Sequence, residues 1–174
     1  MSPPLPPGVR AVSADVLYAS TDLVTADPEM VAILRALAEA SPRRRARLCA
    51  HPDPDAPQQE MLIVMSGDTY VRPHRHLRKS ETLTVLEGEA EALIFDAEGG
   101  LEARIALAPF GQERPFFYRM PQGRFHGLAV RTPWFIFLET TSGPFDPAGS
   151  ESAPWAPADD DRVAGRRFIQ GLRS

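Results

Sequence analysis

The sequence is short of cysteine, of excess positive charge and of long apolar runs. Cys49 is the single cysteine, so no disulfide can form within the chain, and a reducing compartment is the simplest expectation. The formal net charge of −4 argues against nucleic acid, because phosphate binding needs a clear excess of lysine and arginine. No stretch approaches the roughly 20 apolar residues of a membrane span, and MSPPLPPGVR has no apolar stretch like that of a secretory signal. We therefore expect a soluble cytoplasmic protein that binds neither nucleic acid nor membranes.

Proline, by contrast, is abundant and unevenly placed. Four of the 18 prolines fall in residues 1–7, and the Pro-rich segment 143–157 is full of turn residues. A length of 174 residues, 43% of them apolar, suits one domain with a sizeable core. We expect an arm over 1–26, a single domain with a leading helix over 27–157, and a tail over 158–174 that could include a short helix.

One helix is predicted, over residues 27–40. Asp27 is a suitable N-cap and Pro28 fits the first turn. Ser41-Pro42 ends the helix, because a residue before proline disfavours the α region. The basic run over 43–47 is expected to be a solvated helix end. Apolar side chains recur at helical spacing at Met30, Ile33, Leu34 and Leu37.

Short β-prone segments, mostly separated by turn residues, fill the middle of the chain. They are residues 61–66, 69–76, 81–88, 89–96, 101–108, 115–120, 125–131 and 134–141. Strands this short and this regularly spaced favour an all-β sandwich or barrel. The segment 15–24 is also β-prone but has no evident partner in this barrel. We expect it to pair across a two-fold axis, which predicts a homodimer.

Three of the four histidines and one glutamate form a candidate metal site. His74 and His76 stand at i and i+2, a spacing that puts both rings on one face of a strand. Glu81 begins the next predicted strand, and His126 follows a tight turn. Imidazole and carboxylate together suit one divalent transition metal ion: Fe, Mn, Ni, Cu or Zn. Four protein ligands leave one or two open positions in five- or six-fold coordination, which a catalytic site needs.

These residues stand at spacings that resemble the two cupin motifs. Gly67-x6-His74-x-His76-x4-Glu81-x6-Gly88 is similar to the first motif, with one extra residue after the first glycine, and Pro121-x-Gly123-x-x-His126 is similar to the second. The segments SPRRRARLCAH, TYVRPHRH and APWAP further resemble the WbuC-type cupins, small metalloproteins often associated with surface-polysaccharide gene clusters.

The resemblance implies a mainly all-β fold, the cupin double-stranded β-helix or jelly-roll barrel. Here the barrel would have an N-terminal helix and a Pro-rich C-terminal extension. A bound metal ion is implied as well, and so is a homodimer, since cupins commonly pair. The resemblance does not specify a reaction.

Three further residues are candidates for catalysis. Tyr70 and Arg72 share a face with His74 and His76 if one strand runs through all four. Arg72 then either pairs with Glu139 as a structural ion pair or anchors an anionic ligand through its planar guanidinium. Tyr70 is then a proton donor or a residue of the barrel rim.

The sequence leaves three functions open. The first is a metal-dependent enzyme, of oxygenase or isomerase type, that acts on a small polar metabolite, anionic or derived from a sugar. The second is a non-catalytic, metal-dependent module that senses a small ligand. The third is a metal-free isomerase or epimerase that uses His and Glu for acid–base work. His51, in a loop rich in Pro and Asp, is expected at the surface or in an interface.

Overall fold

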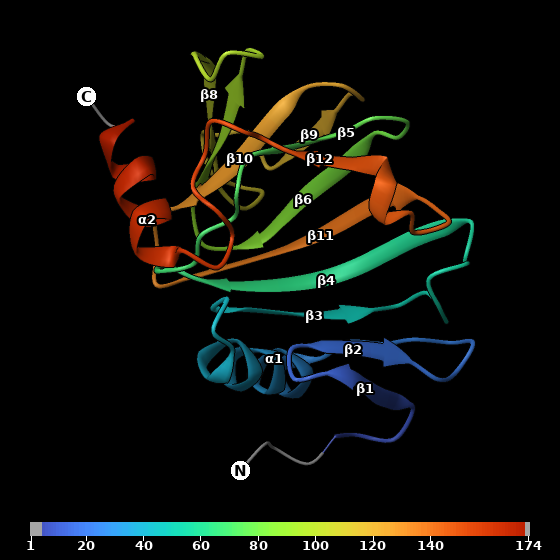
Figure 1. Ribbon diagram of the computed structural model, residues 1–174. Coiled ribbons are helices and arrows are strands. Elements are labelled where there is room, and N and C mark those ends of the chain that lie inside the picture. The colour runs from blue at the N-terminus through green and yellow to red at the C-terminus, as the bar shows by residue number, and fades with distance from the viewer. Residues whose placement is uncertain (1–4, 173–174) are drawn as a thin grey trace.

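Two β-sheets face each other in the computed structural model, which describes residues 5–172 (Figure 1). The larger sheet has, in spatial order, β1 (Val9–Ser13), β2 (Val16–Ala19), β3 (Arg45–Cys49), β4 (Gln58–Ser66), β11 (Trp134–Ser142), β6 (Glu81–Glu87) and β9 (Phe117–Met120). The smaller sheet has β12 (Ser150–Ser152), β5 (His74–His76), β10 (Phe125–Val130), β7 (Ala90–Phe95) and β8 (Leu101–Leu107).

From β5 to β12 the chain passes repeatedly between the two sheets, and this is the double-stranded β-helix of the cupins. The predicted fold class is therefore confirmed, and each of the eight predicted segments contains a strand. Only the last three residues of the segment 69–76 are strand, however, because β5 begins after Pro73. Proline has no N–H to give to a strand ladder.

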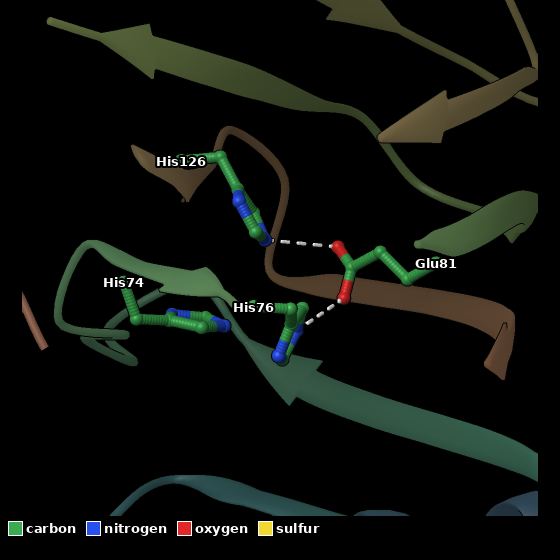
Figure 2. A group of neighbouring side chains, drawn as sticks. All are labelled: His74, His76, Glu81 and His126. Atoms are coloured by element: carbon green, nitrogen blue, oxygen red, sulfur yellow. Dashed lines mark hydrogen bonds and ion pairs between the residues drawn. The ribbon is translucent and has the colours of Figure 1, made fainter. Parts of the chain in front are cut away.

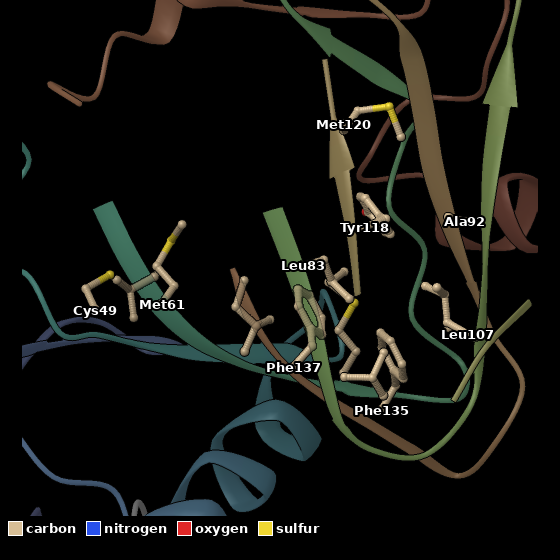
Figure 3. Close-up of a cluster of buried hydrophobic side chains, with 14 of the residues drawn as sticks. Cys49, Met61, Leu83, Ala92, Leu107, Tyr118, Met120, Phe135 and Phe137 are labelled. Carbon is tan, nitrogen blue, oxygen red and sulfur yellow. The ribbon is translucent and has the colours of Figure 1, made fainter. Parts of the chain in front are cut away.

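The barrel interior is apolar and follows from strand alternation. On β11, Phe135 and Phe137 point inward and are fully buried, and on β6 Leu83 and Val85 do the same (Figure 3). Ile136, between the two phenylalanines, faces the other side of the sheet. The same alternation decides which side chains farther along these strands face the interior.

Helix α1 (Pro28–Ala40) covers the outer face of the larger sheet (Figure 1). Its Leu34 is fully buried among apolar side chains of β2, β3, β4 and β11. The predicted cap is confirmed, since the Asp27 carboxylate accepts a hydrogen bond from the Met30 N–H at 2.9 Å. The helix ends at Ser41, as predicted.

The N-terminal strand β2 lies inside the sheet, between β1 and β3. The expectation that segment 15–24 has no partner strand in its own barrel was wrong. Its strand, β2, pairs with β1 on one side and with β3 on the other. β1 and β2 lie in the predicted arm over 1–26, and residues 1–4 of that arm lie outside the described part. The edge strand of the sheet is β1, whose residues are mostly exposed.

The C-terminal segment covers the outer face of the smaller sheet. Helix α2 (Arg162–Gly171) follows a short 3₁₀ helix, η1 (Pro147–Gly149), and strand β12. The possible helix in the tail is thus confirmed. Trp155 packs against Phe95, Phe125 and Phe168 of α2, with ring centroids between 5.0 and 6.0 Å. Within residues 5–172, neither helix has the length and apolar character that crossing a membrane requires.

Candidate metal centre

The four predicted ligands come together from both sheets (Figure 2). His74 and His76 share one face of β5, and His126 of β10 lies directly opposite His74. Glu81 is the first residue of β6, in the other sheet. One potential ligand atom from each of the four residues lies within 4.8 Å of the others. Sequence-local spacing and long-range strand pairing together produce this cluster.

A backbone contact joins the two motifs. The Gly123 N–H, in the turn before His126, donates to the His76 carbonyl at 2.7 Å. Gly123 has a φ of +80°, a left-handed conformation that glycine adopts without strain. The glycine of the second motif therefore lets the turn close onto β5 and brings His126 to the other ligands.

The closest ligand atoms are spaced as they would be around one ion. His76 Nε2 lies 3.0 Å from Glu81 Oε2, and His126 Nε2 lies 3.0 Å from Glu81 Oε1. Adjacent ligands in octahedral coordination, each about 2.1 Å from the ion, are about 3.0 Å apart. The His126 contact is close but not aligned as a hydrogen bond, since His126 Nε2 has no hydrogen-bond partner among the described residues.

Each histidine ring is oriented by a hydrogen bond at Nδ1. The contacts are His74 to the Arg72 carbonyl at 3.0 Å, His126 to the Arg124 carbonyl at 2.9 Å, and His76 to Ser150 Oγ at 2.8 Å. A carbonyl only accepts, so Nδ1 of His74 and of His126 must carry the proton. In the neutral rings, Nε2 then presents a lone pair to the centre of the cluster, as metal-binding histidines do.

The electrostatics of the cluster favour a bound cation. Burial raises the pKa of Glu81, but the two adjacent imidazoles outweigh it, so the pKa lies well below its usual range. Burial lowers the pKa of His126, yet the Glu81 carboxylate outweighs it and raises this pKa. Burial, and next the charge of His126, lowers the pKa of His74 to about 4. A carboxylate with neutral imidazoles around it is a donor set that a divalent cation fits.

The cluster lines a cavity of about 480 Å³ inside the barrel. Glu139 of β11 lines the same cavity as the cluster. Burial, and next the negative charge of Glu81, raises the pKa of Glu139 to about 8. Lys79, in the loop before Glu81, also lines the cavity.

The other two catalytic candidates lie elsewhere, and the shared face predicted for them was wrong. Arg72 donates from Nε and Nη2 to the Ala153 carbonyl, at 3.1 and 2.7 Å, and does not pair with Glu139. Tyr70 is buried and donates its hydroxyl to the Pro157 carbonyl at 2.9 Å. Neither residue lines the cavity. Both residues precede Pro73, and the alternation of faces begins only after it, with strand β5.

Two further expectations, one about the basic run over 43–47 and one about His51, were also wrong. Residues 45–49 form β3 rather than a solvated helix end, and Arg47 lines the cavity. His51 is buried, only 3% exposed, and lines the same cavity. The alternation of polar and apolar residues in RARLC was the signal that could have revealed a strand with Arg47 on its inner face.

Comparisons with known proteins support the fold and leave the function open. The matching family model is described as a Domain of unknown function (DUF6016) and covers residues 26–107, just under half of the chain. No curated protein matches the sequence. The chain is similar to the crystal structure of protein SO0799 from Shewanella oneidensis, with a TM-score of 0.50 and 14% identity over 71% of this chain and 77% of that one.

Two further likenesses are weaker. One is to an uncharacterized conserved protein with a double-stranded beta-helix domain from Klebsiella pneumoniae, with a TM-score of 0.48 and 20% identity over 63% of this chain and 84% of that one. The other is to an oxalate decarboxylase from Bacillus subtilis, with a TM-score of 0.48 and 14% identity over 62% of this chain and 27% of that one. At such identities, similarity speaks to the fold alone.

Proposed function

We propose that this chain is a metal-dependent enzyme that acts on a small polar metabolite at a mononuclear centre held by His74, His76, Glu81 and His126. The observation that carries the proposal is the orientation of the donor atoms. The Nδ1 partners turn the lone pairs of His74 Nε2 and His126 Nε2 toward the Glu81 carboxylate. Lone pairs and a carboxylate facing one another in a buried space are unfavourable without a cation between them.

A divalent ion bound there would supply Lewis-acid chemistry, polarising an oxygen of the substrate or of a water molecule. The chain's own residues would orient the substrate and move protons. Glu139 lines the cavity on the strand beside β6, two residues along from Thr141, which pairs with Glu81. We assign Glu139 the role of proton carrier.

The test is metal analysis of the full chain purified without added metal. We expect about one transition metal ion per chain, because four converging ligands make one site. The Glu139→Gln variant should keep that metal and lose turnover, once a substrate is found. A metal-free wild-type protein that also fails to bind Fe, Mn, Ni, Cu and Zn on titration would rule the proposal out.

The same measurements separate the enzyme from its alternatives. An Fe or Cu centre that consumes O₂ together with a metabolite supports the enzyme, whereas a redox-silent Zn site that only binds a ligand supports the sensing module. Acid–base catalysis without metal would need His126 Nε2 to exchange protons with substrate. Activity that survives complete metal removal would support this alternative and contradict the proposal.

We also propose the finer assignments that the sequence suggested. Relation to the WbuC-type cupins is supported by the segments named above, and a sugar-derived substrate rests on that relation alone. A homodimer is supported by exposed apolar side chains on the outer face of the larger sheet, Leu86, Phe117 and Leu138. Light scattering that gives 19.1 kDa at micromolar concentration would exclude the dimer. A cytoplasmic location is supported by the lone buried Cys49 and is tested by cell fractionation.

A further inference from the structure

The inner face of β3 brings an arginine into the cavity. Ala46 and Leu48 pack under α1, so strand alternation directs Arg47 to the opposite side of the sheet. Its neighbours across the ladder are Val16 of β2 and Ile63 of β4, both in the apolar barrel interior. An arginine in such surroundings is costly unless its donors find an acceptor.

The guanidinium of Arg47 is not fully satisfied by acceptors within residues 5–172. Arg47 Nε is buried and has no hydrogen-bond partner among residues 5–172, and Arg47 forms no ion pair with any carboxylate there. Its side chain contacts the thiol of Cys49, whose pKa is raised by burial. A neutral thiol does not balance the charge of a guanidinium.

The neighbouring arginines differ in this respect. Arg43 donates to Asp15 from Nε and Nη2 at 3.0 and 2.8 Å, and Arg45 donates to Asp159 at 2.8 Å. Both charges are therefore balanced by a carboxylate of the chain. The guanidinium of Arg47 is the member of this basic run that remains to be balanced by something else in the cavity.

A buried histidine beside Arg47 also has an open donor. His51 Nδ1 lies 2.9 Å from the Glu60 nitrogen and 3.1 Å from the Glu60 carbonyl oxygen. We assign the shorter contact as the hydrogen bond, with Nδ1 accepting the Glu60 N–H, which puts the proton of the neutral ring on Nε2. His51 Nε2 is buried and has no hydrogen-bond partner within the described chain. The ring is held edge-on against Tyr18, with centroids 5.3 Å apart. His51 therefore presents a fixed N–H donor to the cavity.

The open donors and the metal cluster belong to one cavity of a size suited to one small ligand. Both sets of residues line the same volume of about 480 Å³, within the range of about 300–1,000 Å³ that is common for ligand pockets. Gln59, next to the His51 partner Glu60, pairs with Thr141, which in turn pairs with Glu81. Gln59 and Glu81 are therefore separated by two strand spacings, roughly 10 Å across the sheet.

The charges in the cavity select an anion. Arg47 and Lys79 are cationic and form no ion pair with any carboxylate in the described chain, whereas Glu81 and Glu139 are carboxylates that line the same cavity. The third lining carboxylate, Asp15, is paired with Arg43. A divalent ion at the cluster adds two positive charges, so the cavity keeps a positive potential even with both carboxylates ionised. A positive, low-dielectric cavity concentrates anions over neutral molecules.

We propose that Arg47 and His51 form an oxyanion-binding subsite, so that the ligand of this cavity is a small molecule with a carboxylate or phosphate group held by Arg47 and His51 and an oxygen at the metal. This inference rests on the proposed function, because it names the ligand class for the same centre. Arginine suits the role, since its planar fork binds both oxygens of a carboxylate or phosphate.

The experiment is calorimetric titration of the metal-loaded full chain with inorganic phosphate, malonate, succinate and glutarate, and with dimethyl succinate as a neutral comparator. We expect at least one oxyanion to bind and the diester not to bind. The chemical source of the oxyanion follows from which probes bind: phosphate alone, or the dicarboxylates with a preference for one chain length.

The variants test the two donors separately. Arg47→Met should weaken oxyanion binding tenfold or more, equal to about 1.4 kcal/mol. His51→Phe keeps the ring against Tyr18 but removes the N–H donor, and should weaken binding about fivefold. Arg104→Met removes a positive charge from β8, outside the cavity, and should change affinity less than about twofold. Arg47→Lys keeps the charge without the fork, and serves if Arg47→Met does not fold.

The outcomes distinguish this inference from the proposed function. If the metal binds but no oxyanion binds at about 10 mM, which corresponds to a binding free energy of about −2.7 kcal/mol, the subsite is refuted and the metal centre stands. The same holds if affinity is unchanged in both Arg47→Met and His51→Phe. If the chain holds no metal but still binds oxyanions through Arg47, the proposed function fails and the subsite stands.

Discussion

The cavity has two walls that differ in how the chain builds them. The ligand wall consists of His74, His76, Glu81 and His126, on strands of the barrel itself. The β3 wall consists of Arg47 and Cys49, on a strand that the N-terminal region adds to the larger sheet, and of His51 just after that strand. In the ligand wall, His76 Nε2 and His126 Nε2 each lie 3.0 Å from a Glu81 oxygen, an arrangement that a bound cation would stabilise. The β3 wall leaves buried donors open.

The difference separates the two tasks of the site. The ligand wall presents four donor groups for one ion, and two of its histidines, His74 and His126, are braced by backbone carbonyls. The β3 wall is incomplete without a molecule that brings an acceptor. The barrel therefore carries the proposed chemistry, and the added strand carries the proposed recognition of the ligand.

The largest expected effect follows from His126→Ala, which breaks the ligand wall alone. Removing one of four ligands should lower metal occupancy at least tenfold, since changes even in the partners of such ligands typically cost 10- to 100-fold in affinity. Metal content per folded chain is measured after dialysis. His51→Phe is the matched control, because it changes a cavity histidine of the β3 wall and should retain full metal. Equal occupancy in His126→Ala and wild type would place the metal elsewhere.

Gly165→Ala should disturb a contact that belongs to neither wall. A Cβ on Gly165 would lie 2.2 Å from Tyr70 Cδ1, so α2 must move away from the buried ring. Overpacking of this kind costs about 1–3 kcal/mol of unfolding free energy, measured by urea denaturation. Gly171→Ala, in the same helix, meets open space and should not destabilise. Metal content should stay the same in both; a lower content in Gly165→Ala would connect Tyr70 to the ligand wall.

Asp15→Asn tests how the β3 wall is held in place. Burial raises the pKa of Asp15, but hydrogen bonds from Arg43, Ser41 and Ser13 outweigh it and lower the pKa from 3.8 to about 2. Such a depressed pKa stabilises the fold above the unfolded-state value, here by about 2 kcal/mol at pH 7. The gain is lost as pH falls toward about 2, and about half is lost by pH 3.

Denaturation of wild type and Asp15→Asn at several pH values checks this. The difference in unfolding free energy should be largest near neutral pH and shrink in acid. A difference that is constant between pH 7 and pH 3 would mean that the ion pair with Arg43 does not hold the segment before β3.

Arg72→Met should have the smallest effect and sharpens the contrast with Arg47. It removes the two hydrogen bonds to the Ala153 carbonyl, which should cost about 1 kcal/mol of unfolding free energy. Oxyanion affinity per folded chain should change less than about twofold, because Arg72 does not line the cavity. A tenfold loss of affinity in Arg72→Met, with none in Arg47→Met, would reverse the assignment of the two arginines.

Local signals account for the parts of the fold that were predicted correctly. Asp27, Pro28 and the apolar spacing define α1, and short β-prone segments between turns define the strands of the barrel. The four clustered residues were found because two of them share a strand face and the others follow turns at motif spacing. The pairing of segment 15–24 with β3 was missed because a parallel pairing leaves no short-range signal in the sequence.

The sequence by itself determined α1, the strands of the barrel and the candidate ligand set, because capping, alternation and i, i+2 spacing act over a few residues. Only the tertiary structure decided which polar side chains reach the cavity. Pro73 ends the alternation, so Arg72 turns to Ala153 and away from the cluster. Arg47 faces the cavity because α1 covers the other side of β3 and β4 lies beside it in a fixed register. The face that such a side chain occupies depends on what covers the sheet, and that is set by packing between segments far apart in the chain.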